Sequence, residues 1–419
     1  AGPWLAPILV ALACLLWHRP YAAVPIAMAC LPALDLAPWT GWFYVDEFDA
    51  LLLVSTAVLL WRLPVQAWGW TRQGLSPWLL VGLGSSWAIS TAIGLWPLQP
   101  WDGNAFSTYL SHYNALRVAK GFAWAVVLAP PAVHALRTRA GGQRTMALGM
   151  LAGLAGVVAV ALWERFVFMG LFDFVSDHRI TATFSAMHTG GAFVEAYLLL
   201  AMPFLAVAYA LYRGIVARTL VLVLFVLGSY ALMVTFARGG YLGYVLSLAV
   251  LAWAAWAHAR AEARTGGRSS IVVPALMVVL LGGAVAYPVL EGSYMQGRWG
   301  ATRSDADIRA RHWSEVVGMM DGGAVGTLFG MGLGRLPETF YFRSPADATL
   351  PSFRYAEEGG GAHLTLGGGS QLFVGQWFGT EYAGAYVLEL DVRSATPGAQ
   401  LDVGFCQKSL LYSHGCTWR

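Results

Sequence analysis

The sequence predicts a mainly α-helical, polytopic membrane protein of about ten spans, followed by a small β-sandwich-like domain. Hydrophobic residues make up 57% of the 419 residues and charged residues only 12%, a composition typical of multi-span membrane proteins. Long apolar runs recur up to residue 290, and many of the 19 tryptophans stand beside their ends, as in interfacial aromatic belts. After residue 345 the pattern changes to short alternations of apolar and polar residues, which indicate strands.

Ten apolar runs are candidate spans, and together they form a predicted transmembrane domain at residues 1–290. A span normally needs about 20 residues, and several of these runs are shorter. The first run begins almost at residue 1 without a signal-peptide charge pattern, so we expect the sequence to begin inside a longer protein. The runs are 4–17, 21–37, 48–61, 77–96, 118–136, 145–163, 191–211, 217–236, 240–257 and 270–289.

The loops between these runs alternate in charge. One set of alternate loops is rich in arginine, with Glu262 as its only acid, and the other set is rich in aspartate and glutamate. By the positive-inside rule the arginine-rich set is cytoplasmic, so the other set, and everything after residue 290, faces outward. The arginine-rich loops carry Arg19, Arg62, Arg72, Arg137, Arg139, Arg144, Arg213, Arg218, Arg260, Arg264 and Arg268.

Three segments of the predicted outer face carry polar residues that can bind a ligand. The loop 164–190 contains Arg179 and His188, and the tight turn between the runs 217–236 and 240–257 contains Arg238. An arginine at such a place in a membrane is costly unless it is paired or functional. The alternatives are an ordinary solvated loop and an arginine that only anchors the turn at the head groups.

The third segment, 304–334, predicts an amphipathic helix followed by a glycine-rich turn, within a periplasmic loop at residues 291–344. Ser304 is the expected N-cap, with Asp307 as its capping-box partner. Arg309 and Arg311 are binding candidates, or they pair with aspartates four residues earlier, at positions 305 and 307. The turn at 330–334 has a Gly-x-Gly-x-Gly pattern, but it follows no βαβ strand, which argues against a dinucleotide site.

The last predicted domain, residues 345–419, is β-rich and is expected to be incomplete at residue 419. Strand-like alternation occurs at 362–366, 370–374, 385–392 and 400–403. Cys406 and Cys416 flank a turn, and we predict a disulfide between them because an outward-facing domain permits one. Cys14 and Cys30 lie in apolar runs and are expected to be small packing residues. No Cys/His spacing suits a zinc site.

Several of these segments, in this order and on this side of the membrane, resemble the O-antigen ligase and polymerase superfamily. The resemblance covers roughly residues 80–340 and rests on Arg179 before a span, Thr-Phe-Ala-Arg-Gly-Gly at 235–240, Arg-Ala-Arg-His-Trp at 309–313 and Phe-Gly-Met-Gly-Leu-Gly at 329–334. These proteins are polytopic glycosyltransferases of the bacterial cytoplasmic membrane, with the GT-C class of fold.

The resemblance implies transfer of a glycan from undecaprenyl diphosphate to a hydroxyl of a lipid or glycan acceptor, on the periplasmic side and with no metal or other cofactor. The family arginines that hold the donor diphosphate correspond to Arg179, Arg238 and Arg309. Arg311 and His188 are further candidates; His188 stands, after Met187, where the family commonly has Pro-Asn.

The family's loop histidine, usually followed by Asn or Ser and proposed to deprotonate the acceptor, has no counterpart here. His363 and His414 stand in different contexts, so no catalytic base is assigned.

Two other kinds of function agree with the same residues. A transporter or flippase for lipid-linked glycans also needs arginines near a diphosphate, but it is expected to carry broken helices or charges near the middle of the bilayer. A non-catalytic assembly subunit needs no base. The net charge of +3 and the absence of a long basic run argue against a nucleic-acid partner.

Overall fold

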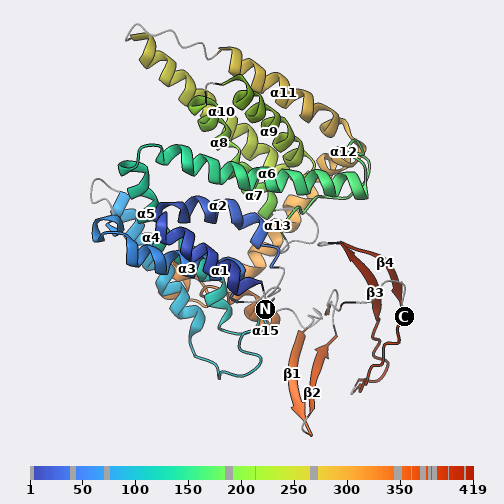
Figure 1. The fold of residues 1–419 in the computed structure, drawn as a ribbon. Coiled ribbons are helices and arrows are strands. Elements are labelled where there is room, and N and C mark those ends of the chain that lie inside the picture. The colour runs from blue at the N-terminus through green and yellow to red at the C-terminus, as the bar shows by residue number, and fades with distance from the viewer. Residues whose placement is uncertain are drawn as a thin grey trace. The chain divides into compact units, whose positions relative to one another are not determined.

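The computed structural model describes residues 4–37, 44–69, 76–184, 192–212, 214–264, 272–343, 352–359, 361–368, 374–375, 379, 385–394, 396–409 and 412–419. Its secondary structure is mainly helical, as predicted (Figure 1). The helices in the first 300 residues are α1 (Leu5–His18), η1 (Pro20–Ala22), α2 (Ala23–Leu34), α3 (Glu47–Arg62), η2 (Val65–Trp68), α4 (Ser76–Leu95), α5 (Asn114–Thr138), α6 (Gly142–Phe168), α7 (Ala192–Ala201), α8 (Pro203–Leu211), α9 (Ile215–Met233), α10 (Arg238–Arg264), α11 (Val272–Glu291) and α12 (Ser293–Gly300). They are followed by α13 (Thr302–Gly318), α14 (Ala324–Phe329), α15 (Leu336–Arg343), β1 (Ser352–Glu358), β2 (Gly361–Gly367), β3 (Gly404–Ser409) and β4 (Tyr412–Trp418).

Among the described residues, five helical segments are long and apolar enough to cross a membrane, and a sixth is added if the pair α11–α12, bent by 75°, counts as one span. Every predicted apolar run overlaps one or two helices in its described part, but the expected number of about ten spans is not confirmed. The runs at the N-terminal end form helices of only 14, 12 and 16 residues, too short to span a bilayer unaided. The five segments are Pro77–Leu95, Asn114–Thr138, Gly142–Phe168, Phe193–Leu211 and Ile215–Met233.

The chain divides into two compact units, residues 1–79 with 120–312 and residues 80–119 with 313–419. The main core belongs to the first unit, where α6 lies alongside α2 and crosses the group formed by α8–α11 (Figure 1). Leu154, Leu198 and Leu232 of this core are completely buried. The predicted domain limits at 290 and 344 stay predictions.

Contacts within the first unit join helix ends of the same predicted set of loops. In the arginine-rich set, three guanidinium groups lie over aromatic rings, with Arg62 over Trp17, Arg139 over Tyr21 and Arg144 over Tyr212. In the other set, Lys120 at the start of α5 binds the carboxylates of Asp46 (2.9 Å) and Asp49 (2.5 Å) before and within α3. Helix ends that the sequence assigns to one side therefore contact one another, and the assignment of the two sides stays a prediction.

The predicted amphipathic helix forms, but its predicted N-cap is wrong. Helix α13 begins at Thr302, so Ser304 lies inside the first turn and donates to the carbonyl of Ala301 (3.0 Å). Its apolar residues Ile308 and Trp313 remain exposed. The chain enters α13 directly after α12, which leaves no room for a separate cap at position 304.

The glycine-rich turn after α14 is a packing element of the second unit. Leu333 donates to the carbonyl of Ser90 on α4 (2.9 Å). A Cβ at Gly334 would come within 2.6 Å of the backbone of Asn114, and Gly334 has a φ of +73°, which favours glycine. The close approach of these chain segments thus explains Gly334.

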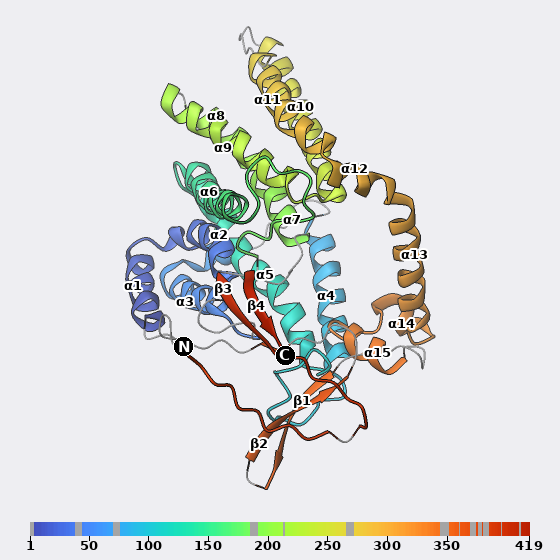
Figure 2. The ribbon, with the colours of Figure 1, turned by 90° about the vertical axis from the view of Figure 1, so that its right-hand side faces the viewer.

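The C-terminal residues form two separate antiparallel pairs, β1–β2 and β3–β4, rather than the expected sandwich (Figure 2). The prediction at 362–366 is confirmed by β2, whereas 385–392 and 400–403 are outside strands and most of 370–374 lies outside the described residues. Val387 is 88% exposed, because the described part provides no second sheet to cover it. The predicted disulfide between Cys406 and Cys416 is confirmed and joins β3 to β4.

Candidate functional site: an arginine cluster at the start of α10

The turn between α9 and α10 is held by its own side chains. Thr235 donates from Oγ1 to the carbonyl of Leu232 (2.7 Å) and accepts from the amide of Ala237 (3.3 Å). Phe236 has a φ of +51°, a conformation that costs a non-glycine residue about 1–2 kcal/mol. Its ring is completely buried and lies edge-on against Tyr294 at 4.9 Å between centroids, and this burial offsets the cost. The turn therefore holds the backbone of the next residue, Arg238, in a fixed position.

Arg238, the first residue of α10, binds the segment around α12 and α13. Its Nη1 donates to the carbonyl of Arg298 (2.6 Å) and to Oγ1 of Thr302 (2.8 Å), and its Nη2 forms an ion pair with Asp305. The sequence offered Asp305 as the partner of Arg309, but the carboxylate goes to Arg238. The guanidinium of Arg238 is thus occupied by the protein itself.

Arg179 reaches the same turn from the loop between α6 and α7. Its Nε donates to the carbonyl of Thr235 (2.8 Å), and its Nη atoms have no hydrogen bond to a described residue. Burial, and then the positive charge of Arg298, lower the pKa of Arg179 below its usual range. Two guanidinium groups therefore lie close enough to repel each other, an arrangement that a bound anion relieves.

Arg298 on α12 completes the cluster, and sequence reasoning missed it. Its guanidinium lies 5.8 Å from the ring centre of Tyr294, and its Nε is buried without a hydrogen-bond partner among the described residues. The sequence feature that could have identified Arg298 is its position: it is a basic residue soon after the end of an apolar run, on the predicted outer side.

Glu195 on α7 is the acid within the cluster, and it too was missed. Its Oε2 is buried without a hydrogen-bond partner in the described part of the chain. The charges of Arg179 and Arg309 both act on this carboxylate, and the side chain of Arg309 is itself exposed. A Cβ at Gly240 would come within 3.1 Å of Oε2, so the glycine lets α10 approach α7 closely.

The structure therefore brings together three of the predicted arginines from three distant segments. The cluster, defined as Arg179, Arg238, Arg298 and Arg309 with Glu195 and Asp305, has four positive and two negative charges. Arg311 is exposed and two residues from Arg309, a spacing that turns it to another side of α13. His188 lies outside the described residues.

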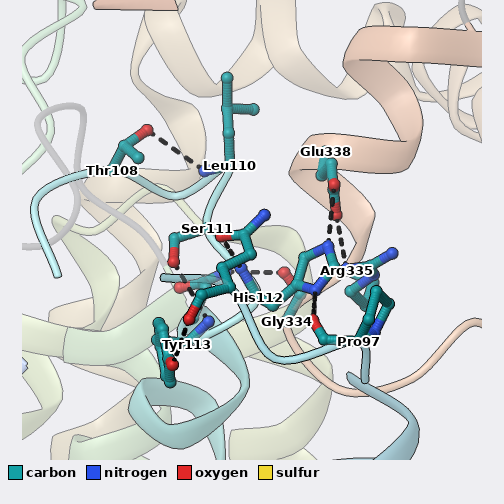
Figure 3. Close-up of polar contacts among 11 residues, drawn as sticks. Pro97, Thr108, Leu110, Ser111, His112, Tyr113, Gly334, Arg335 and Glu338 are labelled. Carbon is teal, nitrogen blue, oxygen red and sulfur yellow. Dashed lines mark hydrogen bonds and ion pairs between the residues drawn. The ribbon is translucent and has the colours of Figure 1, made fainter. Parts of the chain in front are cut away.

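A second polar group, in the other unit, surrounds His112 (Figure 3). The imidazole is nearly fully buried, with Nδ1 2.5 Å from the carbonyl of Pro97 and Nε2 3.1 Å from Oε1 of Glu338. Glu338 also forms an ion pair with Arg335 (2.9 Å) that lacks hydrogen-bond alignment. Because both ring nitrogens are engaged and shielded, this histidine joins α15 to the loop after α4 and is not placed to act as a base.

A pocket of about 620 Å³ lies in the same unit, between the loop after α4 and the pair β1–β2. Most polar side chains of that loop already bond within the unit. Asn104 both donates to and accepts from the backbone of Tyr355 (3.2 and 3.0 Å), and Asp102 accepts from the amides of residues 104 and 105. The pocket therefore offers fewer open polar groups than the arginine cluster.

Comparison of the chain with protein-family models, with curated proteins and with solved structures found no match.

Proposed function

We propose that this chain is a glycosyltransferase that passes a glycan from undecaprenyl diphosphate to a hydroxyl of an acceptor sugar. The observation that carries the proposal is the arginine cluster: the Nε of Arg179 donates to the carbonyl of Thr235 in the turn before α10 (2.8 Å), the charge of Arg298 acts on Arg179, and the charge of Arg309 acts on Glu195 as that of Arg179 does. These three arginines come from three segments, and two of them stand at positions that resemble the donor-binding arginines of the O-antigen ligases and polymerases.

The chemistry of a lipid diphosphate donor fits this cluster. A guanidinium stays charged and offers a planar fork of N–H groups that matches phosphate oxygens. When the bond between sugar and diphosphate breaks, negative charge builds on the leaving diphosphate. Fixed cations at that place stabilise the transition state more than the ground state. The role of Arg238 in this scheme is to hold α12 and α13, and thereby Arg298, against the turn.

The place of the cluster agrees with a reaction at a membrane surface. Arg238 is the first residue of α10, Arg179 lies in the loop that follows α6, and Arg298 lies in α12, which follows α11. The arginine-rich loops at the other helix ends make that other side cytoplasmic by the positive-inside rule. We therefore assign the cluster to the periplasmic face of the bacterial inner membrane, together with the C-terminal strands.

Translocation of the lipid-linked glycan is a second candidate, favoured by two interrupted helices. The apolar segment Phe193–Leu211 is broken before Pro203, and α11 and α12 meet at a bend of 75°. Broken helices of this kind often line transport sites. The four arginines of the cluster lie outside the five apolar segments that are long enough to span a membrane, and this favours transfer.

Reconstitution of the full chain separates the two functions. The protein is inserted into liposomes with a fluorescent undecaprenyl-diphosphate glycan and an acceptor glycolipid, and both transferred product and translocated donor are measured. We expect product to form, and Arg298→Ala to abolish most of it, with no translocation above empty liposomes. Translocation without product, equal in the wild type and in Arg298→Ala, would refute the transferase.

A further inference from the structure

The loop that carries Arg179 is organised by one buried carboxylate, that of Glu164 in the last turn of α6. This side chain is completely buried. Its Oε1 accepts from the amide of Thr181 (3.1 Å) and from Nε2 of His178 (3.1 Å), and its Oε2 accepts from the amide of Ala182 (2.8 Å). A buried carboxylate is costly without such partners, so Glu164 and the loop stabilise each other.

The partners of Glu164 bracket Arg179 on both sides. His178 precedes it, and Thr181 and Ala182 follow it after Ile180, whose side chain is completely buried. With the backbone held at these points, the side chain of Arg179 extends to the turn before α10, where its Nε donates to the carbonyl of Thr235 (2.8 Å). The direction of Arg179 is thus set by Glu164 at one end and by the turn at the other.

The backbone beside Arg179 is held in an unfavourable conformation. Ala182 has a φ of +50°, which costs an alanine about 1–2 kcal/mol. Such conformations persist where the surroundings impose them. Here the amide of Ala182 is bound by Glu164, and the amide of Phe184 donates to the carbonyl of Thr181 (3.0 Å).

The first half of the same loop has a different anchor. Arg165, the neighbour of Glu164, donates to the carbonyl of Asp173, and the hydroxyl of Tyr230 donates to the carbonyl of Leu171 (2.5 Å). Asp173 also accepts from the amides of residues 175 and 176. This half can keep its shape when the contacts of Glu164 are changed.

We infer that Glu164 is a positioning residue that aims Arg179 at the diphosphate of the lipid donor; this inference rests on the proposed function. Glutamine has nearly the same size but only one acceptor oxygen. In Glu164→Gln its amide group meets an amide donor of the loop, and at least one buried N–H loses its partner. Arg179 then keeps its charge but loses its fixed direction.

The test is a double-mutant cycle on binding of undecaprenyl diphosphate to the full chain in nanodiscs. We expect Glu164→Gln to weaken binding about tenfold, roughly 1.4 kcal/mol, in the wild-type background and to have no further effect in Arg179→Ala. A residue that only stabilises the fold would give the same factor in both backgrounds. Asp173→Asn, which keeps the acceptor of the other half-loop, is the matched control and should bind like the wild type.

Each result has one meaning. Equal weakening by Glu164→Gln in both backgrounds, or none in either while Arg179→Ala binds poorly, would overturn the positioning role and leave the proposed function standing. Normal binding by Arg179→Ala would instead refute the proposed donor site. If Glu164→Gln is not recovered as a folded protein, Glu164→Asp, which keeps the charge but is one methylene shorter, takes its place with the same expected coupling to Arg179.

Discussion

Replacing Arg179 or Arg298 by alanine is expected to lower glycan transfer about 10²–10³-fold, the usual loss when one preorganised donor to a developing anion is removed. Both side chains belong to the arginine cluster, and neither has a carboxylate bound to it by hydrogen bonds among the described residues. Removing either therefore takes away a cation for the diphosphate without breaking a hydrogen-bonded ion pair among the described residues. Arg179→Lys should recover little, because lysine lacks the fork that can bind Thr235 and a phosphate together.

The matched control is Arg218→Ala, in the predicted cytoplasmic set. Arg218 makes the same type of bond as Arg179, since its Nε donates to the carbonyl of Tyr212 (3.1 Å), and it lies over the ring of Tyr209. Transfer, measured as product per unit of inserted protein, should be close to the wild-type value in this variant. Similar losses in Arg218→Ala and Arg179→Ala would mean that the assay reports insertion or stability instead of donor binding.

Replacing Arg238 by lysine is expected to lower transfer as strongly, but through the structure of the site. A single ammonium group cannot reach the carbonyl of Arg298, the hydroxyl of Thr302 and the carboxylate of Asp305 together. The start of α13 should loosen and Arg298 should move away from Arg179. Loss of function in Arg238→Lys therefore does not by itself test contact with the diphosphate.

A double-mutant cycle on stability identifies this structural role. Arg238→Lys and Asp305→Asn should each lower the free energy of unfolding, with a coupling of about 0.5–3 kcal/mol, the range for contacting residues. The lower half of that range is expected, because the carboxylate of Asp305 is 39% exposed and solvent weakens the pair. Limited proteolysis in the α12–α13 segment reports the loosening. Additive effects of the two substitutions would show that the ion pair contributes nothing to stability.

The helices predicted from the sequence are confirmed and the number of spans is not, for one physical reason. Apolar periodicity identifies a helix, but only length and surroundings decide whether that helix crosses a bilayer. Residues 48–61 form α3 as expected, yet its first turn carries Glu47 and Asp49, both buried, with Asp49 bound to Lys120 and Trp124. Such polar packing depends on residues over seventy positions away. It therefore cannot be predicted from the sequence of the apolar run alone.

At the β-rich end of the chain, the sequence pattern predicted strands that do not form. Alternation at 385–392 satisfies the strand pattern, but a strand also requires a partner edge, and the described residues supply none for it. The ladders that do form, β1–β2 and β3–β4, join neighbouring segments. The disulfide was predictable because it depends only on a short loop and the redox compartment.

Within the candidate site, the sequence identified single charged residues beside apolar runs, but it did not identify the residues that bind them. Arg179, Arg238 and Arg309 stood out because their places in the sequence are costly or resemble known motifs. Whether Arg238 binds a ligand or the protein depends on Asp305 and Thr302, which are more than sixty residues away. Glu195 and Glu164 became visible only when the fold placed them beside the others.

A structure of the protein determined with undecaprenyl diphosphate tests the donor site most directly. The diphosphate should lie beside the start of α10, with phosphate oxygens within about 2.7–2.9 Å of guanidinium nitrogens of Arg179 and Arg298, as charge-assisted hydrogen bonds require. Arg238 should keep its ion pair with Asp305. Diphosphate density in the pocket beside β1–β2, or at the arginine-rich helix ends, with the arginine cluster empty, would contradict the proposed donor site.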